Sequence, residues 1–135
     1  MKTAEDFRRE LGKADEEQKR VYQTVLEAQS AAIAAAKAEV LGKDVDKAAR
    51  DVIAAAGYGD FFTHSTGHSI GLEVHEGPNF SSRCEEAIPA GAVLSVEPGI
   101  YLEGKYGVRI EDMILITETG CENLTPVAKE LLELS

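Results

Sequence analysis

The sequence predicts an α+β fold in which helices pack on a mostly antiparallel sheet. Between residues 16 and 56, apolar side chains recur every three or four residues, which is the spacing of amphipathic helices. After residue 60, short runs alternate apolar and polar residues, and turns rich in Gly and Pro separate them. Two helices followed by short strands at hairpin spacing favour this class over a parallel α/β fold.

Length and charge narrow the class of protein. A chain of 135 residues has the size of one ordinary domain, so we expect residues 1–135 to form a single domain. The formal net charge of −10 argues against nucleic acid or an anionic membrane as the main partner. Cys84 and Cys121 are far apart and fit two reduced thiols. The first residues lack the apolar segment of a signal peptide, so we expect a cytoplasmic location.

The first helix is expected over residues 16–41. Asp15 and Gln18 have the spacing of a capping box, and the alanine-rich composition adds helix propensity. Gly42 is the predicted C-terminal break. The apolar residues that fall close to helical spacing are Val21, Tyr22, Val25, Leu26, Ala32, Ile33, Ala36 and Val40.

The second helix is expected to begin at Asp44 or Asp46, either of which can serve as its N-cap. Apolar residues at helical spacing continue to Ala56, and Gly57 is expected to end the helix. Both helices have one apolar face and one charged face, so we interpret them as core-packing elements without catalytic residues.

The remaining expected elements are, in chain order, strand-like runs at 61–63, 70–75, 92–97 and 107–117 and a short helix from Thr125 and Pro126 to residue 134. Residues 79–92 are expected to be a loop with a turn at 89–91. In the strand at 107–117, Arg109 and Glu111 share one face, and Asp112 shares the other with isoleucines. In the strand at 92–97, the inward and outward faces stay ambiguous because Val93 shares a face with Glu97.

The stretch HSTGHSIGLEVHEGP, residues 64–78, contains all three histidines of the chain, at positions 64, 68 and 75. Histidine is the commonest neutral metal ligand and the usual proton carrier near neutral pH. For a single histidine, a Gly-rich connection is the simpler interpretation. For the cluster, a functional site is favoured because two acidic residues downstream fit the same chemistry.

His68, Glu97 and Glu111 form a candidate metal-binding set. Imidazole nitrogen together with carboxylate oxygen suits Mn, Fe, Co or Zn, and carboxylates on strands are held rigidly. His64 and His75 would then be available for proton transfer and substrate contacts. The chain lacks the HExxH, CxxC and Walker motifs, which argues against the other common metal and nucleotide sites. Residues 67–71, GHSIG, have the spacing of GxSxG, but the serines near the histidines, Ser65 and Ser69, lack a convincing triad context, which argues against a serine hydrolase.

The histidine stretch and the later segment VLSVEPGIYLEGKYGVRIEDMILITETGCENLT resemble the C-terminal part of the catalytic domain of the Xaa-Pro peptidases. This is the aminopeptidase P and prolidase branch of the pita-bread metallopeptidases. The segment EEQKRVYQTVLEAQ is similar to the same family, and the resemblance runs from residue 13 to residue 134. It implies one half of a pita-bread fold, with helices packed on a curved sheet. It also implies hydrolysis of the bond between an N-terminal residue and proline in a peptide substrate.

The resemblance also implies roles for individual residues. His68, Glu97 and Glu111 match the metal-binding histidine and the two metal-binding glutamates, with Glu111 as the bridging one. Arg109 matches an arginine that orients the neighbouring glutamate. The family uses two divalent ions, such as Mn, Co or Zn, which activate water and polarise the scissile carbonyl.

His64 and His75 match the histidines that contact the substrate and stabilise or protonate the reacting amide. The family supplies two further metal ligands, both aspartates, upstream of the first long helix. Asp6 is the only candidate near that place, and its context, EDFRREL, matches poorly. We therefore expect a chain without the upstream half, with weak activity or none alone and with fewer than two bound ions. A homodimer in which a second copy covers the missing half is a further expectation.

Two alternatives stay open at this point. One is a non-catalytic pita-bread module used for binding, although retention of the histidines and glutamates argues against it. The other is a creatinase-type C–N hydrolase, which the histidine stretch alone does not exclude.

Overall fold

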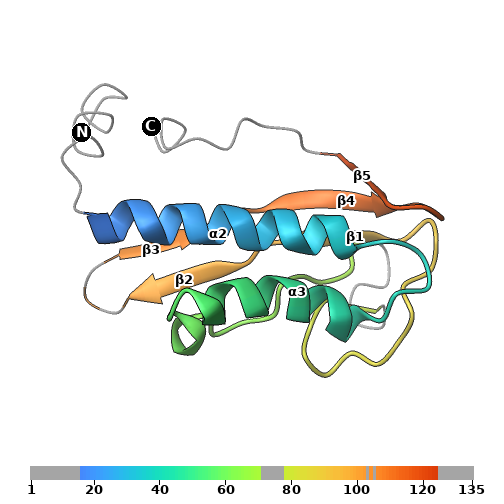
Figure 1. Ribbon diagram of the computed structural model, residues 1–135. Coiled ribbons are helices and arrows are strands. Elements are labelled where there is room, and N and C mark those ends of the chain that lie inside the picture. The colour runs from blue at the N-terminus through green and yellow to red at the C-terminus, as the bar shows by residue number, and fades with distance from the viewer. Residues whose placement is uncertain (1–15, 71–77, 103, 105, 125–135) are drawn as a thin grey trace.

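Two helices, α2 (Glu16–Ala35) and α3 (Gly42–Ala55), lie side by side against the strands, as Figure 1 shows. The computed structural model describes residues 16–70, 78–102, 104 and 106–124. A short 3₁₀ helix, η1 (Gly59–Phe61), follows α3. Both predicted core-packing helices are confirmed, and each buries one apolar face.

The strands form two antiparallel sheets. The first sheet has the order β1-β4-β5 and consists of β1 (Val93–Val96), β4 (Asp112–Ile116) and β5 (Cys121–Asn123). The second sheet pairs β2 (Gly99–Leu102) with β3 (Tyr106–Arg109). Helices on antiparallel strands confirm the predicted α+β class, although the strands form two sheets where the sequence predicted one.

One hydrophobic core joins the helices to the sheets. In β4, Asp112, Ile114 and Ile116 are buried and alternate with half-buried residues, so the predicted common face of Asp112 and the isoleucines is confirmed, and it faces the core. The largest fully buried apolar side chains are Phe80, Ile53, Ile88, Leu94, Ile100, Ile114, Ile116, Val21, Val25, Val45 and Val96.

The first helix ends at Ala35 and not at residue 41, because tertiary hydrogen bonds compete with the helical ones. The N–H of Ala38 donates to the carbonyl of Thr117 at 3.0 Å, and the N–H of Glu39 donates to that of Ile88 at 2.8 Å. Glu39 also has a φ of +76°, which a continuing right-handed helix does not allow. Pairing with neighbouring segments therefore overrides the alanine-rich helix propensity.

The predicted start of the second helix was wrong. Leu41 is the N-cap and makes no side-chain cap, so α3 begins at Gly42, which the sequence had suggested as the end of the first helix. Gly42 is buried, and a Cβ there would lie 1.9 Å from the carbonyl oxygen of Asn79. Asp46 is a buried residue inside the helix. Gly57, with a φ of +93°, follows the C-cap as predicted.

The predicted strand at 107–117 is divided between the two sheets, because β3 ends at Arg109 and β4 begins at Asp112. The strand at 92–97 corresponds to β1, but β2 and β5 were not predicted. The strand-like run at 61–63 was also wrong, since Phe61 belongs to η1. Residues 79–92 contain no helix or strand, and the N–H of Ala92 donates to the carbonyl of Pro89, as expected for the predicted turn.

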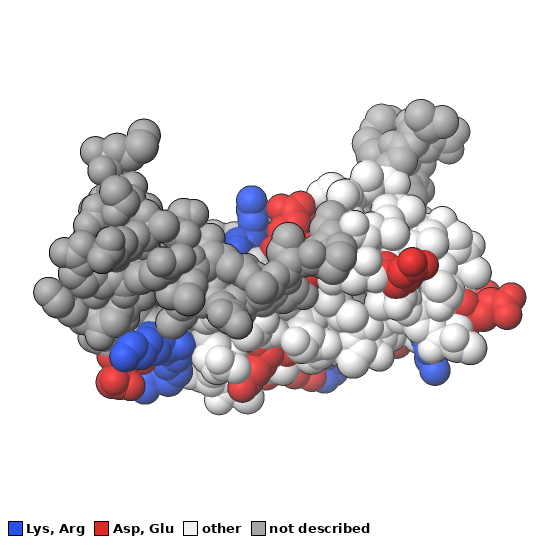
Figure 2. Space-filling view, turned by 90° about the horizontal axis from the view of Figure 1, so that it is seen from above, with Lys and Arg blue, Asp and Glu red and all other residues white. Residues whose placement is uncertain are grey.

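Several predictions fall outside the described residues: the cap at Asp15, most of the strand at 70–75, His75, the C-terminal helix and the comparison at Asp6. No helix in the described part of the chain is long and apolar enough to cross a membrane. On the face seen in Figure 2, acidic and basic side chains are interspersed among uncharged ones and do not gather in one block.

Candidate metal and peptide site

The two predicted glutamate ligands lie at matching breaks of two antiparallel strands. Glu97 stands between β1 and β2, and Glu111 stands between β3 and β4. The register pairs Val96 with Asp112 on one side of the breaks and Gly99 with Arg109 on the other. Pro98 has no N–H to donate to a sheet ladder, which favours a break at this point. The topology therefore brings two carboxyl groups together that are fourteen positions apart.

The segment that carries His68 lies directly on β1. The N–H of His68 donates to Oγ of Ser95 at 3.0 Å, and the N–H of Ser95 donates to the carbonyl of His68 at 2.9 Å. A Cβ at Gly67 would lie 1.8 Å from the carbonyl oxygen of Ser95, so only glycine allows this close approach. Glycine at position 67 is therefore required for the backbone to place His68 beside β1.

His68 and Glu97 face each other. Nε2 of His68 lies 3.5 Å from Oε2 of Glu97, and the side chains are 61% and 15% exposed. Nδ1 of His68 lies 3.1 Å from the carbonyl oxygen of Ser69, which can only accept, so Nδ1 carries the hydrogen in this contact. In the neutral ring, Nε2 then presents a lone pair to Glu97. Oε2 of Glu97 is buried and has no hydrogen-bond partner.

Glu111 lies next to this pair. Partial burial raises the pKa of the Glu111 carboxyl, and the negative charge of Glu97 and a hydrogen bond between the two carboxyl groups raise it further. Arg109 and His68 act in the opposite direction. Two carboxyl groups that are hydrogen-bonded to each other favour a shared proton or a shared cation.

Arg109 is close to Glu111, as their shared strand face predicted. Its Nη2 lies 3.8 Å from Oε1 of Glu111, and the two side chains are 51% and 47% exposed. An exposed pair at this distance contributes little to stability. Its orienting role stays a prediction.

His64 lies against β2. Nδ1 of His64 lies 2.7 Å from the carbonyl oxygen of Ser65, so Nδ1 is the donor there. Nε2 lies 2.7 Å from the hydroxyl of Tyr101, and in the neutral ring it accepts the hydroxyl proton. A cavity of about 350 Å³ adjoins this pair, lined by Arg50, Phe62, Thr63, His64, Ser65 and Ser82.

Sequence reasoning missed two residues of this site, Tyr101 and Gln29. Gln29 on α2 is fully buried, and its Nε2 lies 3.4 Å from the carbonyl of Val96 and 3.2 Å from that of Ile110. These are the residues directly before the two glutamates. A lone amide among the apolar positions of the helix was the available signal. Tyr101 gave no signal, because its role depends on strand β2, which was not predicted.

The structure thus brings His68, Glu97, Glu111 and Arg109 together and places His64 beside Tyr101. Within the described ranges, no group of three or more His, Cys, Asp or Glu side chains is arranged to hold a metal ion by itself. The donor chemistry nevertheless fits a divalent cation, because Nε2 of His68 faces a buried carboxylate oxygen of Glu97 that has no hydrogen-bond partner, and the Glu111 carboxyl lies beside them.

Known proteins are similar to this chain in sequence and in fold. The chain is 48% identical over 122 residues to an Xaa-Pro dipeptidase of Pyrococcus furiosus, covering 90% of this chain and 35% of the relative. It also resembles the solved X-Pro aminopeptidase of Thermotoga maritima, with a TM-score of 0.81 and 52% identity over 86% of this chain and 33% of that one. For the solved prolidase of Pyrococcus horikoshii, the TM-score is 0.82 and the identity 49%, over 87% and 34% of the two chains.

The chain therefore spans about a third of the length of these relatives. Their fold confirms the predicted pita-bread class. The family model of metallopeptidase family M24 matches residues 7–118, which is most of the chain. Its match, the identities near one half and the shared fold lead to one conclusion: this chain belongs to metallopeptidase family M24.

Proposed function

We propose that this chain provides one wall of the site of a metal-dependent Xaa-Pro peptidase, with His68, Glu97 and Glu111 as metal ligands. The observation that carries the proposal is the contact between His68 and Glu97. Two acceptor atoms, Nε2 and Oε2, face each other at 3.5 Å, and the carboxylate oxygen is buried without a hydrogen-bond partner. Leaving a buried carboxylate oxygen unpaired is costly, and a cation between the two atoms removes that cost.

The pair of Glu97 and Glu111 supports the same proposal. Their mutual repulsion raises the pKa of Glu111 in the absence of a cation. A divalent ion held there would supply Lewis-acid chemistry, lowering the pKa of a water molecule and polarising a carbonyl oxygen. Arg109, 3.8 Å from Glu111, would limit the directions that this carboxylate can take.

His64 is proposed to contact the substrate. Because its Nδ1 is committed to Ser65, its Nε2 is the atom that can hold or release a proton, and Tyr101 fixes the ring. The substrate class is a peptide with proline in the second position, as the names of the relatives from Pyrococcus furiosus and Thermotoga maritima suggest for those proteins. His75 keeps its predicted substrate contact as part of this proposal, and the homodimer stays a prediction.

Metal titration tests the ligand set. In isothermal titration with Mn²⁺ or Co²⁺, Glu97→Gln is expected to weaken binding by roughly 100-fold or more, since loss of even an outer contact costs about 10- to 100-fold. Glu122→Gln removes the same charge from an exposed position on β5 and should leave binding unchanged. Equal affinity for the wild type and Glu97→Gln would contradict the assignment.

Hydrolysis assays separate the peptidase from the C–N hydrolase. The Mn²⁺- or Co²⁺-loaded chain is expected to cleave an Xaa-Pro dipeptide weakly or not at all alone, because it provides only one wall of the site, and to leave creatine intact. Cleavage of creatine would favour the C–N hydrolase. Metal binding without cleavage of either compound fits both one wall of a peptidase site and the binding module.

A further inference from the structure

We infer that Asp46 and Arg50 of α3 are positioning residues that jointly fix where His64 and Glu97 lie. The inference rests on the proposed function for the roles of those two residues, but its geometry is independent of any metal ion. Asp46 and Arg50 lie one helical turn apart, and the Asp46 side chain is only 1% exposed. The Arg50 side chain is 32% exposed, but a carboxylate as deeply buried as that of Asp46 needs a reason beyond surface solvation.

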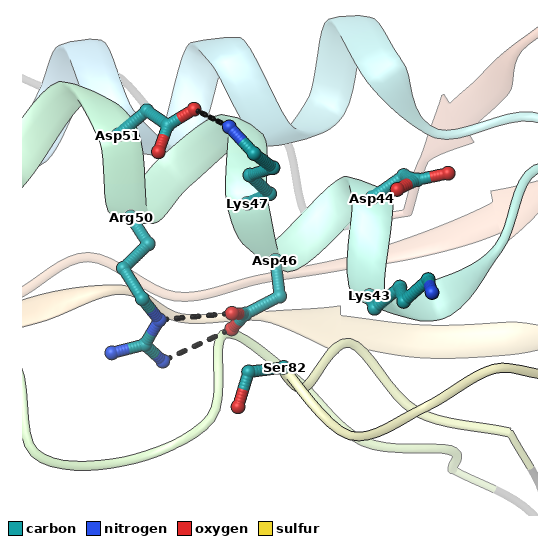
Figure 3. A pocket seen from close by; sticks show the side chains of 7 residues that line it. All are labelled: Lys43, Asp44, Asp46, Lys47, Arg50, Asp51 and Ser82. Atoms are coloured by element: carbon teal, nitrogen blue, oxygen red, sulfur yellow. Dashed lines mark hydrogen bonds and ion pairs between the residues drawn. The ribbon is translucent and has the colours of Figure 1, made fainter.

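The two side chains form a two-point ion pair. Nε of Arg50 donates to Oδ2 of Asp46 at 2.9 Å, and Nη2 donates to Oδ1 at 3.1 Å. This planar contact fixes the guanidinium with respect to α3, since both its position and its plane are determined. Figure 3 shows this pair and the neighbouring Lys47–Asp51 pair, both on α3, lining one pocket.

The fixed guanidinium then holds the segment before the histidine. Nη1 of Arg50 donates to the carbonyl of Phe62 at 3.1 Å, and Nη2 donates to the carbonyl of His64 at 3.0 Å. Cζ of Arg50 also lies 4.1 Å from the centre of the Phe62 ring, which is a cation–π distance. The Phe62 ring in turn meets the His64 ring edge-on at 5.2 Å. Arg50 therefore constrains both the backbone and the ring of His64.

Asp46 holds the other end of the same segment. Its Oδ1 accepts from the hydroxyl of Thr66 at 2.8 Å and from the N–H of Thr66 at 3.1 Å. The carbonyl of Thr66 accepts in turn from the N–H of Glu97 at 2.6 Å. A single carboxylate is thus connected through one residue to the backbone of a proposed metal ligand.

The contacts of Asp46 and Arg50 explain the pair better than helix stability does. Lys47 and Asp51 form an ion pair with the same spacing on the same helix, yet their side chains are 70% and 61% exposed. The Asp46–Arg50 pair instead directs its remaining hydrogen bonds to three alternate positions of the site segment: Phe62, His64 and Thr66. Such contacts to main-chain groups fix where side chains start, which is what a precise site needs.

Replacing Arg50 by lysine tests the contacts that Arg50 makes with Phe62 and His64. Arg50→Lys keeps the charge but cannot make the planar fork or both carbonyl contacts. In the metal-free chain, labelled for NMR, we expect the imidazole resonances of His64 and the amide resonance of Thr66 to shift. Any Xaa-Pro dipeptide cleavage by the metal-loaded chain should fall in kcat/KM by roughly 10- to 100-fold, because the position of His64 is no longer fixed.

Substitutions of Thr66 test the hydrogen bonds that Asp46 accepts, with less risk to folding than substitutions of Asp46 itself. Thr66→Val removes the hydroxyl contact and should shift the Glu97 amide resonance and weaken Co²⁺ binding by roughly 10-fold. Thr66→Ser keeps the hydroxyl and should restore both values. Lys47→Met removes one charge from the neighbouring exposed pair and serves as the control with no expected change.

Two results would overturn the inference. One is unchanged His64 and Glu97 resonances in Arg50→Lys and Thr66→Val. The other is an equal shift in Lys47→Met. A wild-type chain that neither binds metal nor cleaves dipeptides would instead overturn the proposed function, while the metal-free NMR comparison still decides this inference.

Discussion

The sheet beneath α2 and the segment at 62–69 are stabilised by different forces. Between α2 and the sheet, Val25 and Ala28 of α2 and Ile114 of β4 are buried in one apolar core. In the segment, the contacts are hydrogen bonds from and to main-chain groups, such as those of Thr66 and His68. Apolar contacts are numerous and individually weak, whereas each of these hydrogen bonds is specific in direction.

The apolar core therefore mainly determines the stability of the fold, whereas the hydrogen-bonded segment determines how precisely the site residues are placed. A core of interlocking apolar side chains tolerates volume-conserving changes, because many neighbours share the adjustment. Among the segment's side chains, only Phe62 belongs to this core, and His68 is positioned by main-chain hydrogen bonds, so a small displacement of the backbone moves His68 relative to Glu97. We therefore expect changes in the segment to affect the site strongly, and conservative changes in the core to affect mainly the free energy of unfolding.

The largest effect is expected for Gly67→Ala. The added Cβ would lie 1.8 Å from the carbonyl oxygen of Ser95 and 3.1 Å from the Phe80 ring, so the backbone must move away from β1. We expect the free energy of unfolding, measured by urea denaturation, to fall by about 3 kcal/mol, which is the upper part of the usual range for overpacking. Affinity for Co²⁺ should fall with it.

Gly120→Ala is the matched control, because a Cβ there would meet nothing within 4 Å. Its free energy of unfolding should stay within about 0.5 kcal/mol of the wild type. Similar losses in both variants would show that the close approach of Gly67 to β1 is unimportant.

The same contrast explains what the sequence could predict. The two helices and the buried face of β4 follow from periodic apolar residues, and periodicity is visible in a single chain. The grouping of His68, Glu97 and Glu111 came from residue chemistry and family resemblance, and the structure places them side by side.

What could not be predicted depends on non-local hydrogen bonds. The end of α2 at Ala35 and the division of the strand at 107–117 result from pairing with distant segments. Asp46 gave a misleading signal, because an acidic residue near a helix start has the pattern of a cap while its real partners are Arg50 and Thr66.

An intermediate effect is expected for Gln29→Leu. The substitution removes the amide that donates to the carbonyls of Val96 and Ile110, but it also removes a buried Oε1 that has no partner. The two effects partly offset each other, so we expect a loss of about 1 kcal/mol in urea denaturation. The free energy of Co²⁺ binding should fall by more than the free energy of unfolding does, because both carbonyls belong to residues that directly precede proposed ligands.

Gln23→Leu provides the comparison on the same helix. Gln23 is exposed, and its amide contacts only the Glu27 side chain among the hydrogen bonds that the structure gives for it. Neither the free energy of unfolding nor Co²⁺ affinity should change measurably. A loss of stability in Gln29→Leu with unchanged metal affinity would restrict Gln29 to core packing.

The smallest effect concerns the two thiols and leaves folding intact. Burial raises the pKa of the Cys121 thiol, whose Sγ lies 3.5 Å from the carbonyl of Ile33 at the edge of the core. The thiolate is the reactive form, so a raised pKa slows alkylation. Cys84 is also half-buried, in the loop that contacts Gly42, and its thiol donates to the carbonyl of Glu86 in an exposed contact. With iodoacetamide at about pH 8, peptide mapping should find Cys84 modified several times faster.

This difference should narrow as the pH rises, because more of Cys121 then becomes thiolate, and it should vanish in urea, where both residues are solvated. Equal rates in the folded chain would mean that the edge of the core opens as readily as the loop.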